Sequence, residues 1–111
     1  MNIYVLTADT YGTVEEELKD LDVKVLTFPS DRAGASKKEI VMELGGCKTI
    51  CIGNGYNDLP MFKESILSIA VIEKEGAYGK LLYYADIVTC SILDALNIVL
   101  NSDRMKATLR N

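Results

Sequence analysis

Residues 53–60 read Gly-Asn-Gly-Tyr-Asn-Asp-Leu-Pro, and this stretch decides the fold. It follows the apolar run 49–52 and precedes a short amphipathic segment at 61–64. That order is typical of a buried strand, a glycine-containing turn and the start of a helix. In an open parallel sheet, ligands bind outside the carboxyl ends of the strands. The sequence therefore predicts a functional turn at this point.

The turn combines glycines with oxygen donors. Gly53 and Gly55 let the backbone approach a ligand closely or adopt positive φ, and with Asn57 they are our candidates for cofactor binding. Oxygen atoms of the kind that Mg²⁺ prefers come from Asn54, Asn57 and Asp58. A structural turn, with Asp58 as helix N-cap and Pro60 in the first helical turn, accounts for the same residues.

Composition excludes several classes of protein. The 111 residues suit a single domain, 1–111, and 49% of them are hydrophobic. The net charge is −4 and the basic residues do not cluster, so we expect no nucleic-acid partner. No apolar run reaches the ~18 residues of a membrane span, and no secretory signal is visible. These features predict a cytoplasmic protein.

Two residue types limit the chemistry. The chain has no histidine, which removes histidine general-base catalysis and the commonest zinc ligand. Its three cysteines are an odd number without metal-type partners, and we interpret them as core residues of a reduced protein: Cys47, Cys51 and Cys90. Catalysis would have to depend on carboxylates, lysine, hydroxyls and a metal.

Strand and helix patterns alternate along the chain. Strands are predicted at 2–7, 23–28, 49–52, 66–72 and 87–89. One helix is predicted from Thr13, and a second runs from the cap Ser36 to residue 44 after a loop at 29–34. Further helices are predicted at 59–64, at 75–83, and from the cap Ser91. This alternation predicts an α/β, Rossmann-like, doubly wound and mostly parallel sheet of about five strands.

Four segments together resemble the haloacid dehalogenase-like (HAD) superfamily, over nearly the whole chain. They are 6–9 (Leu-Thr-Ala-Asp), Lys37, the turn 53–58, and 85–88 (Ala-Asp-Ile-Val). The pattern is most similar to the phosphorylation domain of P-type ATPases and to small soluble P-type ATPase-like proteins. The resemblance implies phosphoryl transfer, in which an aspartate attacks while Mg²⁺, a lysine and backbone donors neutralise charge.

The resemblance assigns roles residue by residue. Thr7 matches the second motif, a hydroxyl that binds the phosphoryl group, and Lys37 matches the lysine that opens a helix. Asn54 and Asp58 match the acidic turn that holds Mg²⁺. Without the resemblance, Thr7 is a β-branched residue in a strand, and Lys37, beside Lys38, is a solvated helix residue.

The chain departs from the superfamily in two ways. The first motif, with its nucleophile, has no counterpart before Thr7, so its central strand would leave either a gap or direct pairing of 2–7 with 49–52. A gap would expose strand edges and favour a homodimer. Asn54 stands where an aspartate usually binds the metal, which predicts weaker Mg²⁺ binding.

A second alignment with the superfamily stays open. Residues 9–13, Asp-Thr-Tyr-Gly-Thr, also follow a strand and match the pattern of the first motif. Asp9 would then be the nucleophile and Thr27 the phosphoryl-binding hydroxyl. We favour the first alignment, because Tyr11 replaces the usual second Asp or Thr and little chain separates Asp9 from Thr27.

These patterns leave two main functions and one structural alternative. The first is a Mg²⁺-dependent HAD-type phosphatase, which without a cap domain would suit a large phosphorylated substrate. The second is a non-catalytic remnant that binds phosphate, metal or a partner. The structural alternative is a flavodoxin-like domain in which the turn 53–58 has no chemical role.

Overall fold

The computed structural model describes residues 2–8, 16, 19–20 and 22–101. Its strands are β1 (Tyr4–Thr7), β2 (Lys24–Thr27), β3 (Ile50–Gly53), β4 (Leu67–Val71) and β5 (Ile87–Thr89). Its helices are α2 (Ala33–Leu44), α3 (Leu59–Glu64), α4 (Gly79–Tyr84) and α5 (Ile92–Leu100), with 3-10 turns η1 (Ser30–Arg32), η2 (Gly46–Lys48) and η3 (Tyr56–Asp58). The predicted α/β alternation is confirmed.

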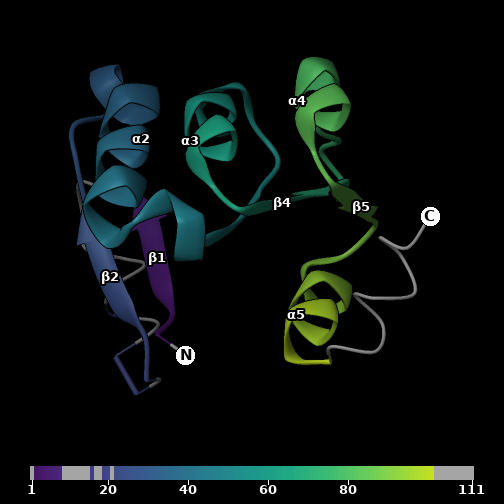
Figure 1. Cartoon of the computed structure of the whole chain (residues 1–111), viewed down its shortest axis with the longest axis horizontal. Helices are drawn as coiled ribbons and strands as arrows, with labels where there is room; N and C mark the ends of the chain where they lie inside the picture. Colours follow the sequence, from purple (N-terminus) through teal and green to yellow (C-terminus); the bar gives the residue numbers. More distant parts are fainter. Residues whose placement is uncertain (1, 9–15, 17–18, 21, 102–111) are drawn as a thin grey trace.

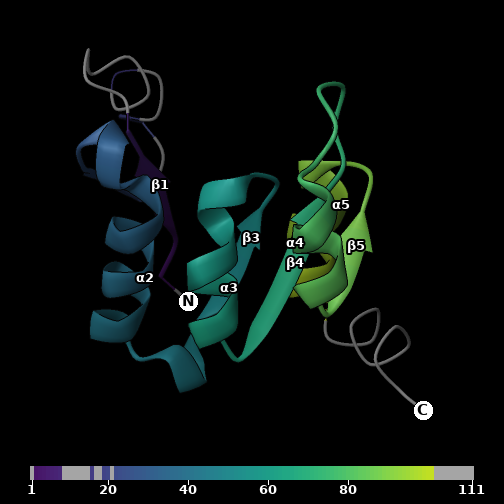
Figure 2. The ribbon, with the colours of Figure 1, turned by 90° about the horizontal axis from the view of Figure 1, so that it is seen from above.

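The five strands form two parallel sheets rather than one continuous sheet. One sheet pairs β1 with β2, and the other has the order β3-β4-β5. Figures 1 and 2 show the β1–β2 pair beside α2, on the opposite side of the molecule from β5. The sequence left open either a gap or direct pairing between 2–7 and 49–52, and β1 and β3 are not paired in the described residues.

Helices cover both faces of the three-stranded sheet, as in a doubly wound fold. Side chains of β4 alternate between two apolar clusters. One cluster joins α2, α3 and α4: Val41, Cys51, Met61, Phe62, Ala70 and Leu81. The other joins the opposite face to α5: Leu67, Ile69, Val71, Ile87 and Ala95. Figure 1 shows α3 and α4 on one side of β4 and β5, and α5 on the other.

Helix α2 begins earlier than predicted. Its first residue is Ala33, which is buried, so Ser36 lies in the helix instead of capping it. The predicted loop 29–34 contains η1 and the helix start, because burial of Ala33 extends the helix. Helix α2 ends at residue 44 as predicted, and Gly45 stops it: its φ is +97°, a value that favours glycine, and its N–H bonds to the carbonyls of Val41 and Met42.

Helix α4 begins later than predicted. Residues 73–76 form a tight turn closed by an antiparallel bridge between Glu73 and Gly76, where Gly76 has a φ of +83°. The helix can therefore start only at Gly79. The cap Ser91 is confirmed, since its hydroxyl accepts a hydrogen bond from Asp94 N at 3.0 Å. The predicted helix from Thr13 lies mostly outside the described residues.

The prediction that all three cysteines are core residues was wrong in part. Cys51 is buried, whereas Cys47 and Cys90 are exposed, and all three are free thiols. Cys47 lies in η2 and Cys90 follows β5, where the chain leaves the sheet. Within the part of the chain that the structure describes, no helix has the length and apolarity needed to span a membrane.

Candidate functional site

The turn after β3 is organised around the carboxylate of Asp58. Its Oδ2 accepts hydrogen bonds from the backbone N–H groups of Asn54 and Gly55, both at 3.0 Å. Its Oδ1 accepts from Lys37 Nζ at 2.7 Å. Asp58 does precede α3 as predicted, but its carboxylate bonds back to the turn and does not cap that helix. The turn therefore holds a nearly fully buried carboxylate in one orientation.

Gly53 is required by the close approach of Asp58. A Cβ at position 53 would lie 2.5 Å from Asp58 Cγ, inside any tolerable contact distance. At Gly55 a Cβ would lie 3.6 Å from its nearest neighbour, Asn57 Oδ1, and its φ of −117° suits any residue. The structure thus gives Gly53 a steric role, whereas Gly55 contributes its N–H.

Lys37 reaches this turn from the second turn of α2. Its ammonium bonds to Asp58 and also to Asn57 Oδ1 at 3.0 Å. The side chains of Lys37 and Asp58 are only 13% and 6% exposed, so the pair is shielded from solvent. Lys38, its neighbour in the sequence, is half exposed, and its Nζ lies 3.9 Å from Glu64 Oε1. The structure therefore brings Lys37, Asn57 and Asp58 together.

Asn54 faces a different neighbour. Its side-chain amide donates a hydrogen bond to Glu75 Oε1 at 3.3 Å. The backbone carbonyl of Asn54 accepts a hydrogen bond from Tyr78 N at 2.8 Å. Tyr78 in turn packs edge-on against Tyr56, with ring centroids 5.3 Å apart. Sequence reasoning did not link Glu75 or Tyr78 to the turn, because both lie more than twenty residues downstream and no local pattern connects them to it.

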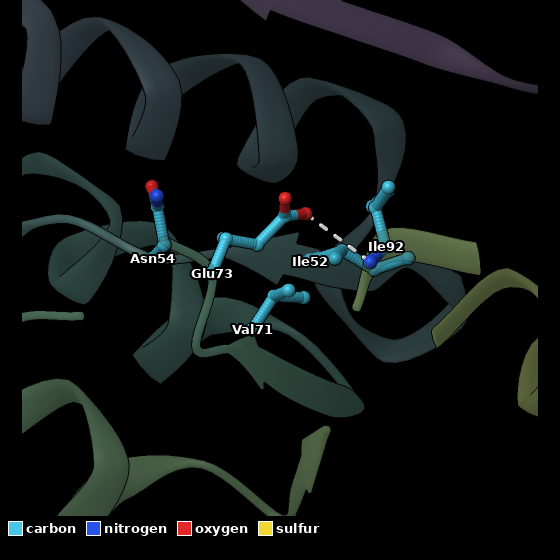
Figure 3. Close-up of a pocket in the computed structure, with 6 residues that line it drawn as sticks. Ile52, Asn54, Val71, Glu73 and Ile92 are labelled. Carbon is cyan, nitrogen blue, oxygen red and sulfur yellow. Dashed lines mark hydrogen bonds between the residues drawn. The ribbon is translucent and has the colours of Figure 1, made fainter. Parts of the chain in front are cut away.

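A shallow pocket of about 270 Å³ lies where β3 and β4 end. Its lining includes Ile52, Val71 and Ile92, with Asn54 and Glu73 supplying polar atoms. Figure 3 shows Asn54 and Glu73 pointing to the same side, and Glu73 Oε1 accepting a hydrogen bond from Ile92 N at 3.2 Å. The loops after β3 and β4 thus share one concave, partly apolar surface.

The threonine candidates lie on the other sheet. Thr7 ends β1 and pairs in register with Thr27 at the end of β2, so the hydroxyl residues of both alignments are neighbours. Asp9, the alternative nucleophile, lies outside the described residues.

A Mg²⁺ ion does not fit the described residues by themselves. They contain no group of three or more His, Cys, Asp or Glu side chains close enough to share a metal. Asp58 already accepts three hydrogen bonds, and Asn54, whose amide bonds to Glu75, is uncharged. Because Mg²⁺ seeks anionic oxygen ligands in octahedral geometry, a metal would need further ligands from outside this set.

Cys51 is a buried thiol in the core next to the site. Burial raises the pKa of the Cys51 thiol to about 11, opposed by a hydrogen bond with Ser65 and reinforced by the negative charge of Asp58. The thiol lies in β3 with its Sγ 3.8 Å from the Met61 carbonyl. Cys51 is therefore a packing residue next to the site, without nucleophilic character.

Comparison with known proteins finds one relative in sequence and several solved structures with a similar fold. No protein-family model matches the chain. An uncharacterized protein of Methanocaldococcus jannaschii, MJ0073, is 45% identical over 74 residues, which are 67% of this chain and 80% of that protein.

The solved structures show the fold. A protein of Legionella pneumophila assigned to HAD subfamily III A matches with a TM-score of 0.72 at 19% identity, over 98% of this chain and 62% of its own. The cobalt-bound form of the deoxy-D-mannose-octulosonate 8-phosphate phosphatase of Haemophilus influenzae matches with 0.72 at 16%, over 99% and 67%.

A protein assigned to the HAD hydrolase family, from Streptomyces avermitilis, matches with a TM-score of 0.65 at 24% identity, over 81% of this chain and 51% of its own. The chain thus spans about half to two thirds of these proteins and has their HAD-like, Rossmann-type fold.

Proposed function

The chain belongs to the family of MJ0073, and we propose that it is a HAD-type phosphoric monoester hydrolase domain of the soluble P-type ATPase-like kind. The observation that carries the proposal is the shielded Lys37–Asp58 pair at the carboxyl end of β3, with a nitrogen–oxygen distance of 2.7 Å. A buried ion pair is weak evidence for stability alone. Its place at the end of a parallel strand, where ligands bind, favours a functional role.

Lys37 is suited to neutralise a phosphoryl group. An ammonium group has three N–H donors, and the structure uses two of them on Asn57 and Asp58. The third N–H is available for a phosphoryl oxygen. Asp58 and Asn57 would hold the ammonium in place, so that little side-chain entropy is lost when the phosphate binds.

Only the second alignment supplies a nucleophile within these 111 residues, so the proposal takes Asp9 as nucleophile and Thr27, which ends β2, as the phosphoryl-binding hydroxyl. In it, the Asp9 carboxylate attacks phosphorus, the bond to the ester oxygen breaks, and the leaving alcohol takes a proton from water. Water then hydrolyses the aspartyl phosphate and releases inorganic phosphate. Thr27, which lies beside Thr7 in the register of β1 and β2, would donate its hydroxyl to a phosphoryl oxygen.

The proposal also covers the size of the substrate, the cellular compartment and the cofactor. The described residues hold no domain inserted over the turn, so the proposed substrate is a large phosphorylated molecule. We assign the protein to the cytoplasm because its cysteines are free thiols. We propose Mg²⁺ as the cofactor with Asp9 as an added ligand, since Asp58 and Asn54 do not suffice to bind it. We also propose a homodimer.

The test is hydrolysis of an aryl phosphate by the purified chain, with Mg²⁺ and with EDTA. We expect Mg²⁺-dependent release of phosphate that Asp9→Asn abolishes and Lys37→Met lowers by at least about a hundredfold. Lys38→Met is the matched control on the same helix and should leave the rate unchanged. A folded protein without turnover, or one in which Asp9→Asn keeps full activity, would contradict the proposal.

A second function is favoured by one observation. Both carboxylate oxygens of Asp58 already accept hydrogen bonds within the chain, which leaves them little capacity to bind a catalytic metal. In that case the chain is a phosphate- or partner-binding remnant of the HAD fold. Phosphorus NMR of inorganic phosphate with the wild type and Lys37→Met would then show Lys37-dependent binding with no hydrolysis.

A further inference from the structure

A second shallow pocket, of about 300 Å³, lies beside the turn after β3. The turn contributes Asn54 and Gly55 to its lining, and residues 75–78 of the loop after β4 form the rest. The N–H groups of both turn residues bond to the carboxylate of Asp58, which in turn accepts a hydrogen bond from Lys37. The pocket therefore borders the groups that position the proposed phosphate-binding lysine.

The loop that forms the other wall of this pocket is fixed in position. Gly76 N donates to the Glu73 carbonyl at 2.8 Å, in a turn where Gly76 has a φ of +83°. Tyr78 N donates to the Asn54 carbonyl at 2.8 Å, which ties the loop to the turn after β3. Because backbone hydrogen bonds already hold both walls, a ligand does not have to order them when it binds.

Glu75 gives the pocket a negative charge. Its Oε1 accepts a hydrogen bond from the Asn54 amide at 3.3 Å, and no ion pair among the described residues involves Glu75. The segment 73–78 carries two glutamates and one lysine, a net charge of −1. A carboxylate without a basic partner in the chain is suited to a charge-assisted hydrogen bond with a cation from a ligand.

The aromatic residues at the pocket also suit a cation. Tyr78 lines the pocket, and its ring meets the ring of Tyr56, which is 73% exposed, edge-on at 5.3 Å. The rings of Tyr83 and Tyr84 meet edge-on at the same distance, and there Lys63 lies over the Tyr84 ring at 4.7 Å. No described lysine or arginine lies over Tyr56 or Tyr78. Their ring faces are therefore available to a cation from a ligand.

We propose that this pocket binds a positively charged group of the substrate, held by Glu75 and the two tyrosine rings, while Lys37 binds the phosphoryl group. The inference rests on the proposed phosphatase function and names its substrate class, phosphate esters that also carry a cation. The cation is a basic side chain near a phosphorylated residue, or the ammonium group of a small amino-alcohol phosphate. An ester without a cation would leave Glu75 facing the negative phosphate unpaired, which disfavours it.

Binding without any chemistry tests the pocket by itself. The probe is the unphosphorylated peptide Gly-Arg-Ser-Arg-Gly, and its control has glutamine in place of both arginines. We expect the probe to shift the amide NMR signals of Gly76, Ala77 and Tyr78, and Glu75→Gln to weaken its binding at least about fivefold. Glu43→Gln removes the same charge from an exposed position of α2 and should bind the probe as the wild type does.

Hydrolysis then tests whether the pocket selects the substrate. The two peptides are compared with phosphate on serine, and O-phosphoethanolamine is compared with ethyl phosphate. The measured quantity is the ratio of kcat/KM between the cationic and the neutral member of a pair, which cancels any general effect of a variant on catalysis. We expect a ratio of at least about five that Glu75→Gln brings close to one and Glu43→Gln preserves. The pair with the larger ratio identifies the source of the cation.

The outcomes separate this inference from the proposed function. Peptide binding that depends on Glu75, without any turnover, would contradict the phosphatase function but support the cation-binding pocket. Turnover with equal kcat/KM for both members of each pair would overturn the inference and leave the phosphatase function standing. Equal losses of binding in Glu75→Gln and Glu43→Gln would also overturn it, because attraction to the protein's net charge of −4 would then account for the binding.

Discussion

The two sheets of this molecule bury their strands to different degrees. All five residues of β4 are buried, and this strand has a partner on each side. All four residues of β1 are only half-buried, and β1 pairs on one side with β2. Since the two strands have similarly apolar sequences, the number of neighbouring strands, more than composition, accounts for the difference.

The site joins these unequal halves. Its turn follows β3 in the three-stranded sheet, whereas Lys37 comes from α2, the helix that follows β2. The Lys37–Asp58 contact therefore ties α2, which follows β2 in the chain, to the turn that follows β3, next to the packing of α2 on α3. Substitutions in each half should show how much of the stability each supplies.

The largest expected contrast is between the two strands themselves. Ile69→Ala in β4 removes a fully buried side chain and should lower the free energy of unfolding by about 3–4 kcal/mol. Val5→Ala in β1 should cost less than about 1.5 kcal/mol, because Val5 is half-buried. Denaturant unfolding of both variants measures the difference, and equal losses would contradict the contrast.

Two glycines of the turn after β3 should differ in how much their substitution destabilises the protein. Gly53→Ala forces Asp58 to move and should destabilise the protein by about 2–3 kcal/mol. Gly55→Ala, where a Cβ has ordinary space, should change stability by less than about 1 kcal/mol. Thermal unfolding compares the two, and a tolerant position 53 would show that the carboxylate is not fixed.

Loss of the Lys37–Asp58 contact should lower the free energy of unfolding by somewhat less than Gly53→Ala does. Lys37→Met leaves the Asp58 carboxylate shielded without its cation and should cost about 2 kcal/mol. Lys38→Met, on the exposed side of the same helix, should cost less than about 0.5 kcal/mol. If both variants unfold at the same denaturant concentration, α2 and the turn are not coupled through Lys37.

The smallest effect concerns pH. The folded protein keeps the Cys51 thiol protonated up to a pKa of about 11, whereas the unfolded chain loses this proton near 9.0. Stability should therefore fall as pH rises through this window, by at most about 1.4 kcal/mol per pH unit. Cys51→Ala should remove this part of the slope.

The three thiols should also differ in reactivity. At pH 8, alkylation should modify Cys47 and Cys90 but spare Cys51.

Much of the fold could be predicted from local patterns. The strands, α3, the Gly45 stop and the Ser91 cap follow from apolar runs and single capping residues, which act over a few positions. The start of α2 at Ala33 could not be predicted, because burial against distant residues sets it. The division into two sheets likewise depends on pairing between distant strands, which periodicity does not encode.

The candidate site divides in the same way. The turn 53–58 could be recognised from glycine and oxygen-donor spacing, but the partners of its side chains could not. Lys37 and Lys38 are equivalent in sequence, and only the direction of α2 places the first against Asp58. The bond from Asn54 to Glu75 depends on the tight turn at Gly76, far along the chain.

The contact between Gly53 and Asp58 also has a consequence for recognising relatives. A side chain at position 53 is incompatible with an acid docked at 58, and that acid needs the cation from 37. The three identities should therefore change together in evolution, or not at all. A lysine, fifteen residues, a glycine, four residues and an aspartate form a fingerprint that could find members of this lineage after overall identity has faded.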